Sequence, residues 1–174
     1  MENRKSSLLG ILLSISDFLI LKNYNFALIG GLAYSVIFEP RATYDLDFII
    51  EVEDFDKFLK DLKSNSDFIF VHDKPMIFEN GEIERVVHKN NTVVDFLIAD
   101  DEYKRNILRR KRELIVNQKK LFIITVEDLI ILKLLSSRNI DVVDVKNLLK
   151  LKDLDNDYID YWIDKLKLTK PEIE

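Results

Sequence analysis

Two aspartates separated by a single residue carry the strongest chemical signal in this chain. Asp45 and Asp47 open a segment, Asp-Leu-Asp-Phe-Ile-Ile, that alternates polar and apolar residues before it becomes fully apolar. This pattern is typical of a strand that enters a core. Residues i and i+2 of a strand point to the same face, roughly 6–7 Å apart at the backbone. Two carboxylates at that spacing can bind a divalent cation such as Mg²⁺, which prefers oxygen ligands and keeps coordination positions open for phosphates.

A pair of glycines precedes the aspartates. Gly30 and Gly31 lie between a short apolar run, residues 26–29, and residues 32–38, which can form a helix. Glycine lets the backbone come close to a phosphate, and a helix N-terminus adds N–H donors. Ser35 is one turn into that helix, where its hydroxyl could contact phosphate or sugar. Each feature is common alone, but a strand, a Gly-Gly turn, a helix and a strand opened by Asp-x-Asp form a much rarer combination.

A third carboxylate belongs to a segment that is otherwise apolar. Asp95 lies within Thr92–Ile98. An unpaired charge in such surroundings is costly, so a metal-binding role explains this acid well. The alternative is a residue of an edge strand that faces solvent.

The elements that must position these residues follow from periodicity and turn signals. The pattern predicts an α+β fold with a mixed β-sheet, helices packed on it and a helical C-terminal part. We expect residues 1–124 to form the α/β core with an N-terminal helix, and residues 125–174 to be the helical part of the same domain. The predicted helices are 5–22, 32–38, 53–62, 101–110, 129–135, 141–151 and 155–166; the predicted strands are 26–29, 45–50, 68–71, 76–78, 82–88, 92–98, 113–116 and 121–124.

Turn residues refine this prediction. Asn80-Gly81 and Asn90-Asn91 separate consecutive strands, so residues 76–98 are expected to form an antiparallel meander. Asn117-Gln118 turns a second strand pair. Thr125 and Asp128 have the spacing of a capping box at the start of a helix. The two histidines, His72 and His88, are predicted to be surface residues.

Composition excludes several classes of protein. The 174 residues are 47% hydrophobic and 33% charged, which is typical of a globular protein, and the net charge of −5 argues against a globally basic nucleic-acid coat. Without cysteine there is no disulfide, Cys-ligated zinc, iron–sulfur cluster or thiol nucleophile. No apolar run reaches the roughly 18 residues of a membrane span. Leu8, Leu12, Ile15 and Leu19 have helical spacing, which favours an amphipathic helix over a signal peptide. We expect a soluble, cytoplasmic protein without membrane contact.

Together the motifs resemble the signature of the polymerase-beta-like nucleotidyltransferase superfamily. Gly30-Gly31 with Ser35, followed by Arg41-x-Thr43-x-Asp45-x-Asp47, carries the resemblance. More narrowly, this spacing is similar to that of small stand-alone prokaryotic proteins grouped with the nucleotidyltransferase toxins of abortive-infection and toxin–antitoxin systems. The resemblance continues weakly through residues 125–133 and 138–144, so that it covers about residues 26–150.

The resemblance implies an activity and a set of site residues. The implied reaction moves a nucleoside monophosphate from an NTP to an acceptor hydroxyl on RNA (such as tRNA), a protein or a small molecule. The implied catalytic acids are Asp45, Asp47 and Asp95, which would hold Mg²⁺, or Mn²⁺ in its place. The implied nucleotide contacts are Gly30, Gly31, Ser35, Arg41, Thr43 and Lys133.

Four assignments stay open at the level of sequence. Lys133 either faces the cleft and offsets charge on the leaving group, or extends to solvent from an apolar helix. Arg41 contacts phosphate or pairs with an acid. Asp141 and Asp144, three residues apart on a helix, are expected to be solvated, with a functional role as the alternative. Lys104–Lys120 holds eight basic residues and one acid, Glu113; it is a solvated surface or a track for tRNA or another RNA.

Two other functions compete with catalysis or accompany it. A catalytically silent relative with this fold would bind nucleotide or a partner, although the presence of all three acids counts against it. A cognate antitoxin would bind the Leu- and Ile-rich C-terminal helices. No Walker P-loop, Rossmann fingerprint or serine–histidine hydrolase signature is found.

Overall fold

The computed structural model describes residues 7–72, 74–78, 81–136 and 138–172. Its elements, in chain order, are α1 (Leu8–Leu21), β1 (Asn25–Ile29), α2 (Gly30–Ile37), β2 (Leu46–Glu51), α3 (Phe55–Ser64), β3 (Phe68–Phe70), β4 (Met76–Phe78), β5 (Gly81–His88), β6 (Val93–Ile98), α4 (Glu102–Arg110), β7 (Arg112–Val116), β8 (Lys119–Ile123), α5 (Val126–Ser136), α6 (Asn139–Leu148) and α7 (Asn156–Leu166).

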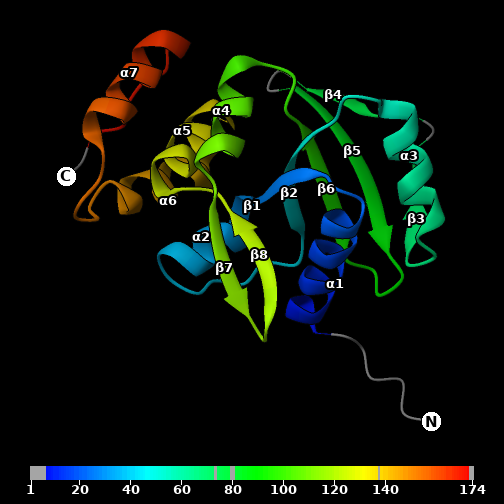
Figure 1. Ribbon diagram of the computed structural model, residues 1–174. Helices are drawn as coiled ribbons and strands as arrows, with labels where there is room; N and C mark the ends of the chain where they lie inside the picture. The colour runs from blue at the N-terminus through cyan, green and yellow to red at the C-terminus, as the bar shows by residue number, and fades with distance from the viewer. Residues whose placement is uncertain (1–6, 73, 79–80, 137, 173–174) are drawn as a thin grey trace.

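The strands of the described chain form one mixed sheet. Seven of them follow the order β3-β5-β6-β2-β1-β8-β7, and β4 pairs with β5 (Figure 1). β2 runs antiparallel to β1 and parallel to β6, while β1 runs parallel to β8. The predicted α+β fold with a mixed sheet and a helical C-terminal part is therefore confirmed.

Two of the predicted turns place the strands beside them correctly, while Asn80 of the predicted Asn80-Gly81 turn lies outside the described residues. β4, β5 and β6 form the expected antiparallel meander. β7 and β8 form a hairpin in which Asn117 and Gln118 have φ angles of 50° and 65°. Two central residues with positive φ match the twist of antiparallel strands, and asparagine tolerates this conformation better than most residues.

An aromatic cluster joins one face of the sheet to the helices that cover it. The rings of Phe48 and Phe96 stack at 5.7 Å, and Phe58 of α3 meets Phe96 edge-on at 5.5 Å. Phe18 of α1 contacts Phe68 in the same way at 5.9 Å. Aromatic pairs at these separations favour edge-to-face and offset geometries. This cluster fixes α1 and α3 against the strands, while α6 and α7 lie on the other side of the molecule (Figure 1).

Helix α5 begins with only half of the predicted capping box. The backbone N–H of Asp128 donates to the Thr125 hydroxyl at 3.2 Å, as a cap requires. The Asp128 carboxylate does not reach back to the backbone. It is fully buried, accepts a hydrogen bond from the Thr125 hydroxyl at 2.8 Å, and pairs with Arg110 at 3.2 Å.

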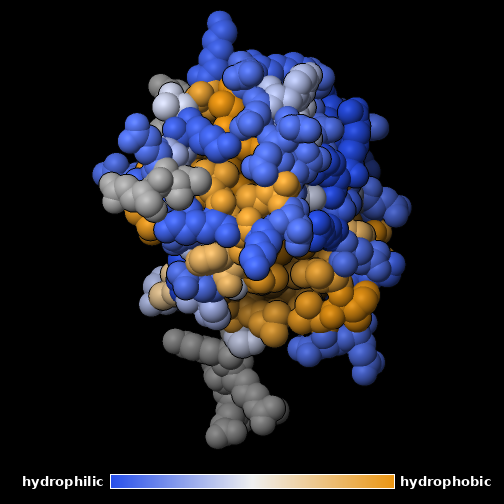
Figure 2. All heavy atoms as spheres, turned by 90° about the vertical axis from the view of Figure 1, so that its left-hand side faces the viewer, coloured by the Kyte–Doolittle hydropathy of each residue, from blue (hydrophilic) through white to orange (hydrophobic). Residues whose placement is uncertain are grey.

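Apolar side chains remain exposed on the side of the molecule that carries α6. Figure 2 shows orange atoms gathered on this face among hydrophilic ones. Ile140, Val142 and Val143 of α6 and Val36 of α2 are among the exposed large hydrophobic residues. The binding of an antitoxin to the C-terminal helices stays a prediction, and α6 is where those helices present apolar side chains.

The prediction for His72 is confirmed and that for His88 is wrong. His72 is exposed, whereas His88 ends β5 and is only 4% exposed, with its ring against Phe68. Burial lowers the pKa of His88. The alternation of β5 places Glu84, Val86 and His88 on the face that packs inward.

Glu84 makes the stability of this fold depend on pH. Burial raises its pKa from 4.5 to about 7, and the side chain faces a small cavity beside Lys63 of α3. An acid whose pKa is raised on folding binds its proton more tightly in the folded state, so stability is lost as pH rises from about 4.5 to about 7.

Glu84→Gln should remove the loss of folding stability that the wild type shows as pH rises. We expect the variant to match the wild type at about pH 5 and to exceed its free energy of unfolding by about 2–3 kcal/mol at about pH 8. Urea denaturation at the two pH values measures the difference, with the exposed Glu53→Gln as the control. An equal effect of Glu84→Gln at both pH values would contradict the assignment.

Candidate active site

The Gly-Gly turn is built around the carboxylate of Asp47. Gly30 opens α2 with φ +69°, and a Cβ placed on it would lie 2.0 Å from Oδ2 of Asp47. Only glycine both adopts this positive φ readily and leaves space for the Asp47 carboxylate. Gly31 supplies a backbone hydrogen bond to the same carboxylate. The turn therefore positions Asp47 directly at the N-terminus of a helix.

The segment before β2 packs against the second glycine. A Cβ on Gly31 would lie 3.2 Å from both Nη2 of Arg41 and Oγ1 of Thr43. The Ser35 hydroxyl donates to the Gly31 carbonyl at 3.1 Å and accepts from the backbone N–H of Arg41 at 3.4 Å. In this arrangement Ser35 ties the loop to α2, and its expected contact with a nucleotide stays a prediction.

Sheet register brings two of the three predicted acids side by side. Asp47 of β2 is the parallel partner of Asp95 on β6. Burial first, and then the neighbouring charges of Asp95 and Asp45, raise the pKa of Asp47 from 3.8 to about 6 against the opposing effect of Arg138. β6 lies between β2 and β5, so the alternative of a solvent-facing edge strand for Asp95 is wrong.

The three acids differ in how well they suit the binding of a divalent cation. Asp45 lies one residue before β2 and is exposed, while Asp47 is crowded by like charge that a cation would relieve. Both offer the oxygen ligands that Mg²⁺ prefers. Asp95, in contrast, is engaged by Arg85. Across residues 7–72, 74–78, 81–136 and 138–172, no group of three or more Asp, Glu or His side chains is arranged to hold a metal ion.

Arg85 is a site residue that the sequence reasoning missed. It lies on β5 directly opposite Asp95, and its Nε and Nη2 donate to the two carboxylate oxygens at 2.7 and 2.6 Å. The turn at Asn90-Asn91 could have indicated this pair. Counting away from the turn along the strand on each side brings residues 85 and 95 to within one residue of being opposite each other. That pairing depends on the register of the turn, which Asn-Asn leaves open.

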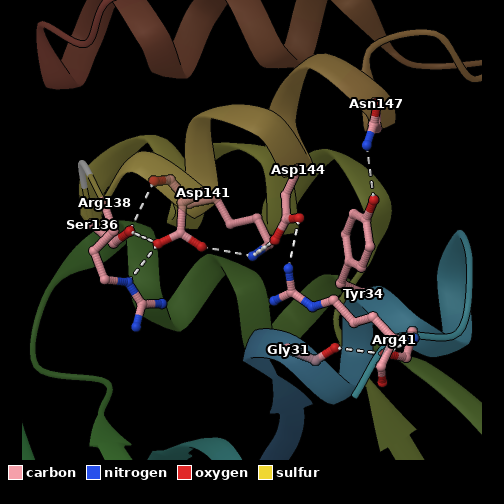
Figure 3. A network of polar contacts seen from close by, with 10 residues as sticks. Gly31, Tyr34, Arg41, Ser136, Arg138, Asp141, Asp144 and Asn147 are labelled. Atoms are coloured by element: carbon pink, nitrogen blue, oxygen red, sulfur yellow. Dashed lines mark hydrogen bonds and ion pairs between the residues drawn. The ribbon is translucent and has the colours of Figure 1, made fainter. Parts of the chain in front are cut away.

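A buried chain of charges connects the helical part to the Gly-Gly turn. Lys133 of α5 donates to Asp141 at 2.8 Å and to Asp144 at 2.6 Å, and all three side chains are at most 5% exposed. Arg41 donates to the other oxygen of Asp144 at 2.7 Å, and Arg138 donates to Asp141 at 2.6 Å. Figure 3 shows Arg138 and Asp141 at one end of this network and Asp144 and Arg41 at the other.

This network overturns one expectation and decides between the alternatives left open for two other residues. The Asp141–Asp144 pair is buried and not solvated, because α6 turns both carboxylates inward toward α5. Lys133 does not extend to solvent; it lines the cleft with its ammonium held between two acids. Of the two alternatives for Arg41, the structure has the ion pair with an acid.

Asp47 and Asp95 line a cleft of about 380 Å³. Other charged residues of both signs and several apolar residues line it as well. The charged lining residues are Asp47, Arg85, Asp95, Lys133, Arg138 and Asp141; the apolar ones include Phe78, Ile83, Leu97, Leu129 and Leu132. A cleft lined by acids, cations and apolar side chains suits a ligand that carries charged phosphates and a flat ring.

Half of the basic residues in the segment Lys104–Lys120 form ion pairs with acids of the protein itself. Lys104 is buried and pairs with Asp100 and Asp101, and Arg110 pairs with Glu127 and Asp128. Near the end of the segment, Lys119 pairs with Asp17, and Lys120 pairs with Glu113. Arg109 and Arg112 are exposed. These ion pairs disfavour a continuous track for RNA phosphates.

Among the described residues, no helix is both long and apolar enough to cross a membrane.

Comparison with solved structures defines the class of fold. No family model matches the chain, and no curated protein matches it in sequence. The antibiotic-resistance factor ANT(2'')-Ia aligns with a TM-score of 0.61 at 10% identity, over 96% of this chain and 93% of that one. The lincosamide antibiotic adenylyltransferase LnuA, in its lincomycin-bound form, aligns with a TM-score of 0.53 at 15% identity, over 86% and 98% of the two chains.

A third neighbour extends the same result. An antigenic nucleotidyltransferase-like protein from Paracoccidioides brasiliensis aligns with a TM-score of 0.51 at 17% identity, over 89% of this chain and 86% of that one. The chain therefore has a nucleotidyltransferase-like fold over nearly its whole length.

Proposed function

We propose that this protein is a divalent-cation-dependent nucleotidyltransferase that moves a nucleoside monophosphate from an NTP to an acceptor hydroxyl. The observation that carries the proposal is the position of Asp47. Its carboxylate is held by the Gly-Gly turn at a helix N-terminus, faces a cleft, and has Asp45 and Asp95 near enough to raise its pKa. Such crowding of acids is unfavourable unless a cation binds there.

The residues of the cleft suit the parts of an NTP. Asp45 and Asp47 would hold Mg²⁺, or Mn²⁺ in its place, which when bound neutralises phosphate charge and lowers the pKa of a hydroxyl. The N-terminus of α2 and the exposed guanidinium of Arg138 offer donors to the triphosphate. Apolar side chains that line the cleft, such as Phe78, can contact the base.

The reaction requires a path for one proton. The acceptor oxygen forms a bond to the α-phosphorus, the bond from that phosphorus to the bridging oxygen breaks, and pyrophosphate leaves. The proton of the acceptor hydroxyl passes to a carboxylate, for which Asp95 is our candidate. That role requires Asp95 to be free of Arg85 when substrate is bound.

We infer that the acceptor is a protein side chain or a small molecule and not an RNA. Ion pairs within the protein engage four of the eight basic residues of the segment Lys104–Lys120, so the expected RNA track is interrupted along its length. If the protein acts as the toxin of a toxin–antitoxin pair, its expression should arrest growth, and Asp47→Asn should abolish the arrest.

A second candidate is supported by a specific observation. Both oxygens of Asp95 bind Arg85, and a silent relative that binds nucleotide without transferring it would need no third free acid. The two candidates differ in one measurable product, because only catalysis forms an acceptor that carries the nucleoside monophosphate.

Incubation with each NTP labelled at the α-phosphate separates the two candidates. The protein is incubated with Mg²⁺ alone, with total tRNA, with cell lysate and with a panel of hydroxylated small molecules, and Asp47→Asn runs beside it. Transfer of label by the wild type but not by the variant supports the enzyme and identifies the acceptor class. Nucleotide binding without transfer in any mixture supports the silent relative and contradicts the proposed activity.

A further inference from the structure

Three charged side chains lie in a row across three adjacent strands. Arg85 of β5 is opposite Asp95 of β6, which in turn is the partner of Asp47 on β2. Directly paired residues of neighbouring strands point to the same face of a sheet. All three residues line the same cleft. The order across the sheet is therefore cation, anion, anion, and Asp45 lies one residue before β2, two residues along the chain from Asp47.

The contact between Arg85 and Asp95 uses the whole carboxylate. Two parallel N–H donors meet the two oxygens at 2.7 and 2.6 Å, the fork geometry that makes such pairs strong. The Asp95 side chain is 15% exposed and that of Arg85 is 37% exposed. A cation that binds Asp95 must first displace the guanidinium from at least one oxygen, since the pair shields both.

The other cations of the cleft are engaged elsewhere. Lys133 is held by Asp141 and Asp144, and Arg138 is bound to Asp141. Arg85 is thus the cation that binds a carboxylate of the central strands directly, while the charge of Arg138 also acts on Asp47. Its partly exposed side chain lines the cleft, where an anion that enters could bind it.

We propose that Arg85 holds Asp95 in the nucleotide-free protein and releases it to a divalent cation when the triphosphate of an NTP binds the guanidinium. Arg85 is then a positioning residue for Asp95 in the free state and a phosphate ligand in the bound state. This inference rests on the proposed function for the identity of the anion. Because the exchange joins two binding events, metal and nucleotide affinities are coupled reciprocally.

Metal binding without nucleotide tests the first half of the exchange. The readout is the electron paramagnetic resonance signal of free Mn²⁺ titrated with protein. Arg85→Gln should bind Mn²⁺ about tenfold more tightly than the wild type, since Asp95 is freed. In an Asp95→Asn background, Arg85→Gln should give no such gain. Arg138→Gln removes one positive charge from the same cleft without freeing Asp95 and should give a much smaller gain.

Three results would overturn this half of the proposal. Arg85→Gln could bind Mn²⁺ no more tightly than the wild type. The gain could persist in the Asp95→Asn background, or Arg138→Gln could produce an equal gain, and either result would reduce the effect to general electrostatics. Circular dichroism of each variant checks that the fold is intact, and Arg85→Lys, which keeps the charge but loses the fork, should give an intermediate gain.

Nucleotide binding without metal tests the second half. A non-hydrolysable ATP analogue is titrated in the presence of EDTA, and Arg85→Gln should bind it about tenfold more weakly than the wild type because a charge-assisted contact is lost. Unchanged affinity would refute the transfer of Arg85 to the triphosphate. An Asp95-dependent gain in Mn²⁺ affinity together with no label transfer would refute the proposed enzymatic function while supporting the role of Arg85.

Discussion

Asp47→Asn should abolish nucleotide transfer and at the same time stabilise the folded protein. The substitution removes a charge that would bind the metal, and we expect the rate of transfer to fall by at least about 10³-fold. The same charge is unfavourable in the free protein, because burial and the neighbouring Asp95 and Asp45 act against it. Asparagine keeps an oxygen that can accept the hydrogen bond from Gly31. We expect the free energy of unfolding near neutral pH to rise by about 1–2 kcal/mol.

The paired readout makes this prediction specific. Label transfer and urea denaturation are measured on the same preparations, with Asp160→Asn as the matched control. Asp160 is an exposed carboxylate on α7 that pairs with Lys170, so its loss should change activity little and stability by less than about 1 kcal/mol. Loss of activity accompanied by loss of stability would show that Asp47 supports the fold and would contradict the assignment of its carboxylate to the site.

Asp144→Ala should destabilise the protein more than any exposed substitution in the chain. It leaves Arg41 without its carboxylate and Lys133 with only one of two buried partners. Breaking a buried ion pair from one side leaves an uncompensated charge, which typically costs 3–5 kcal/mol. We expect a loss of about 3 kcal/mol, because Asp141 still binds Lys133. Urea denaturation at neutral pH measures the change.

Asp144→Ala should also affect nucleotide binding, because Asp144 holds Arg41 near the Gly-Gly turn. Arg41 packs against Gly31, so its release should weaken nucleotide binding even where the protein remains folded. Asp160→Ala on α7 serves as the exposed control, and Asp144→Asn, which keeps an acceptor for Lys133, should lose less stability than Asp144→Ala. A loss below about 1 kcal/mol for Asp144→Ala would mean that the network is dispensable.

The local elements could be predicted because their signals are local. The period of apolar residues and the turns at Asn90-Asn91 and Asn117-Gln118 gave the meander and the hairpin. The pair Gly30-Gly31 and the aspartates after it indicated phosphate and metal chemistry from their types and spacing alone. These features depend on backbone conformation within a few residues, which the sequence encodes directly.

Contacts across the sheet and between helices could not be predicted in this way. The pairing of Arg85 with Asp95 depends on strand register, and a shift of one residue would place Arg85 on the opposite face. The burial of His88 depends on β3, whose Phe68 lies opposite it in the sheet and packs against its ring. Neither is encoded in the residues that flank the site.

The helical part shows the same difference between features that the sequence determines and contacts that only the tertiary structure decides. The sequence determined that helices follow residue 125 and that Lys133, Asp141 and Asp144 lie on them. Only the tertiary structure decided that these charges meet one another in the interior and hold Arg41, because α5 and α6 pack with their charged residues facing. A buried charge must find a partner when water is removed, and which partner it finds is set by packing between elements far apart in the chain.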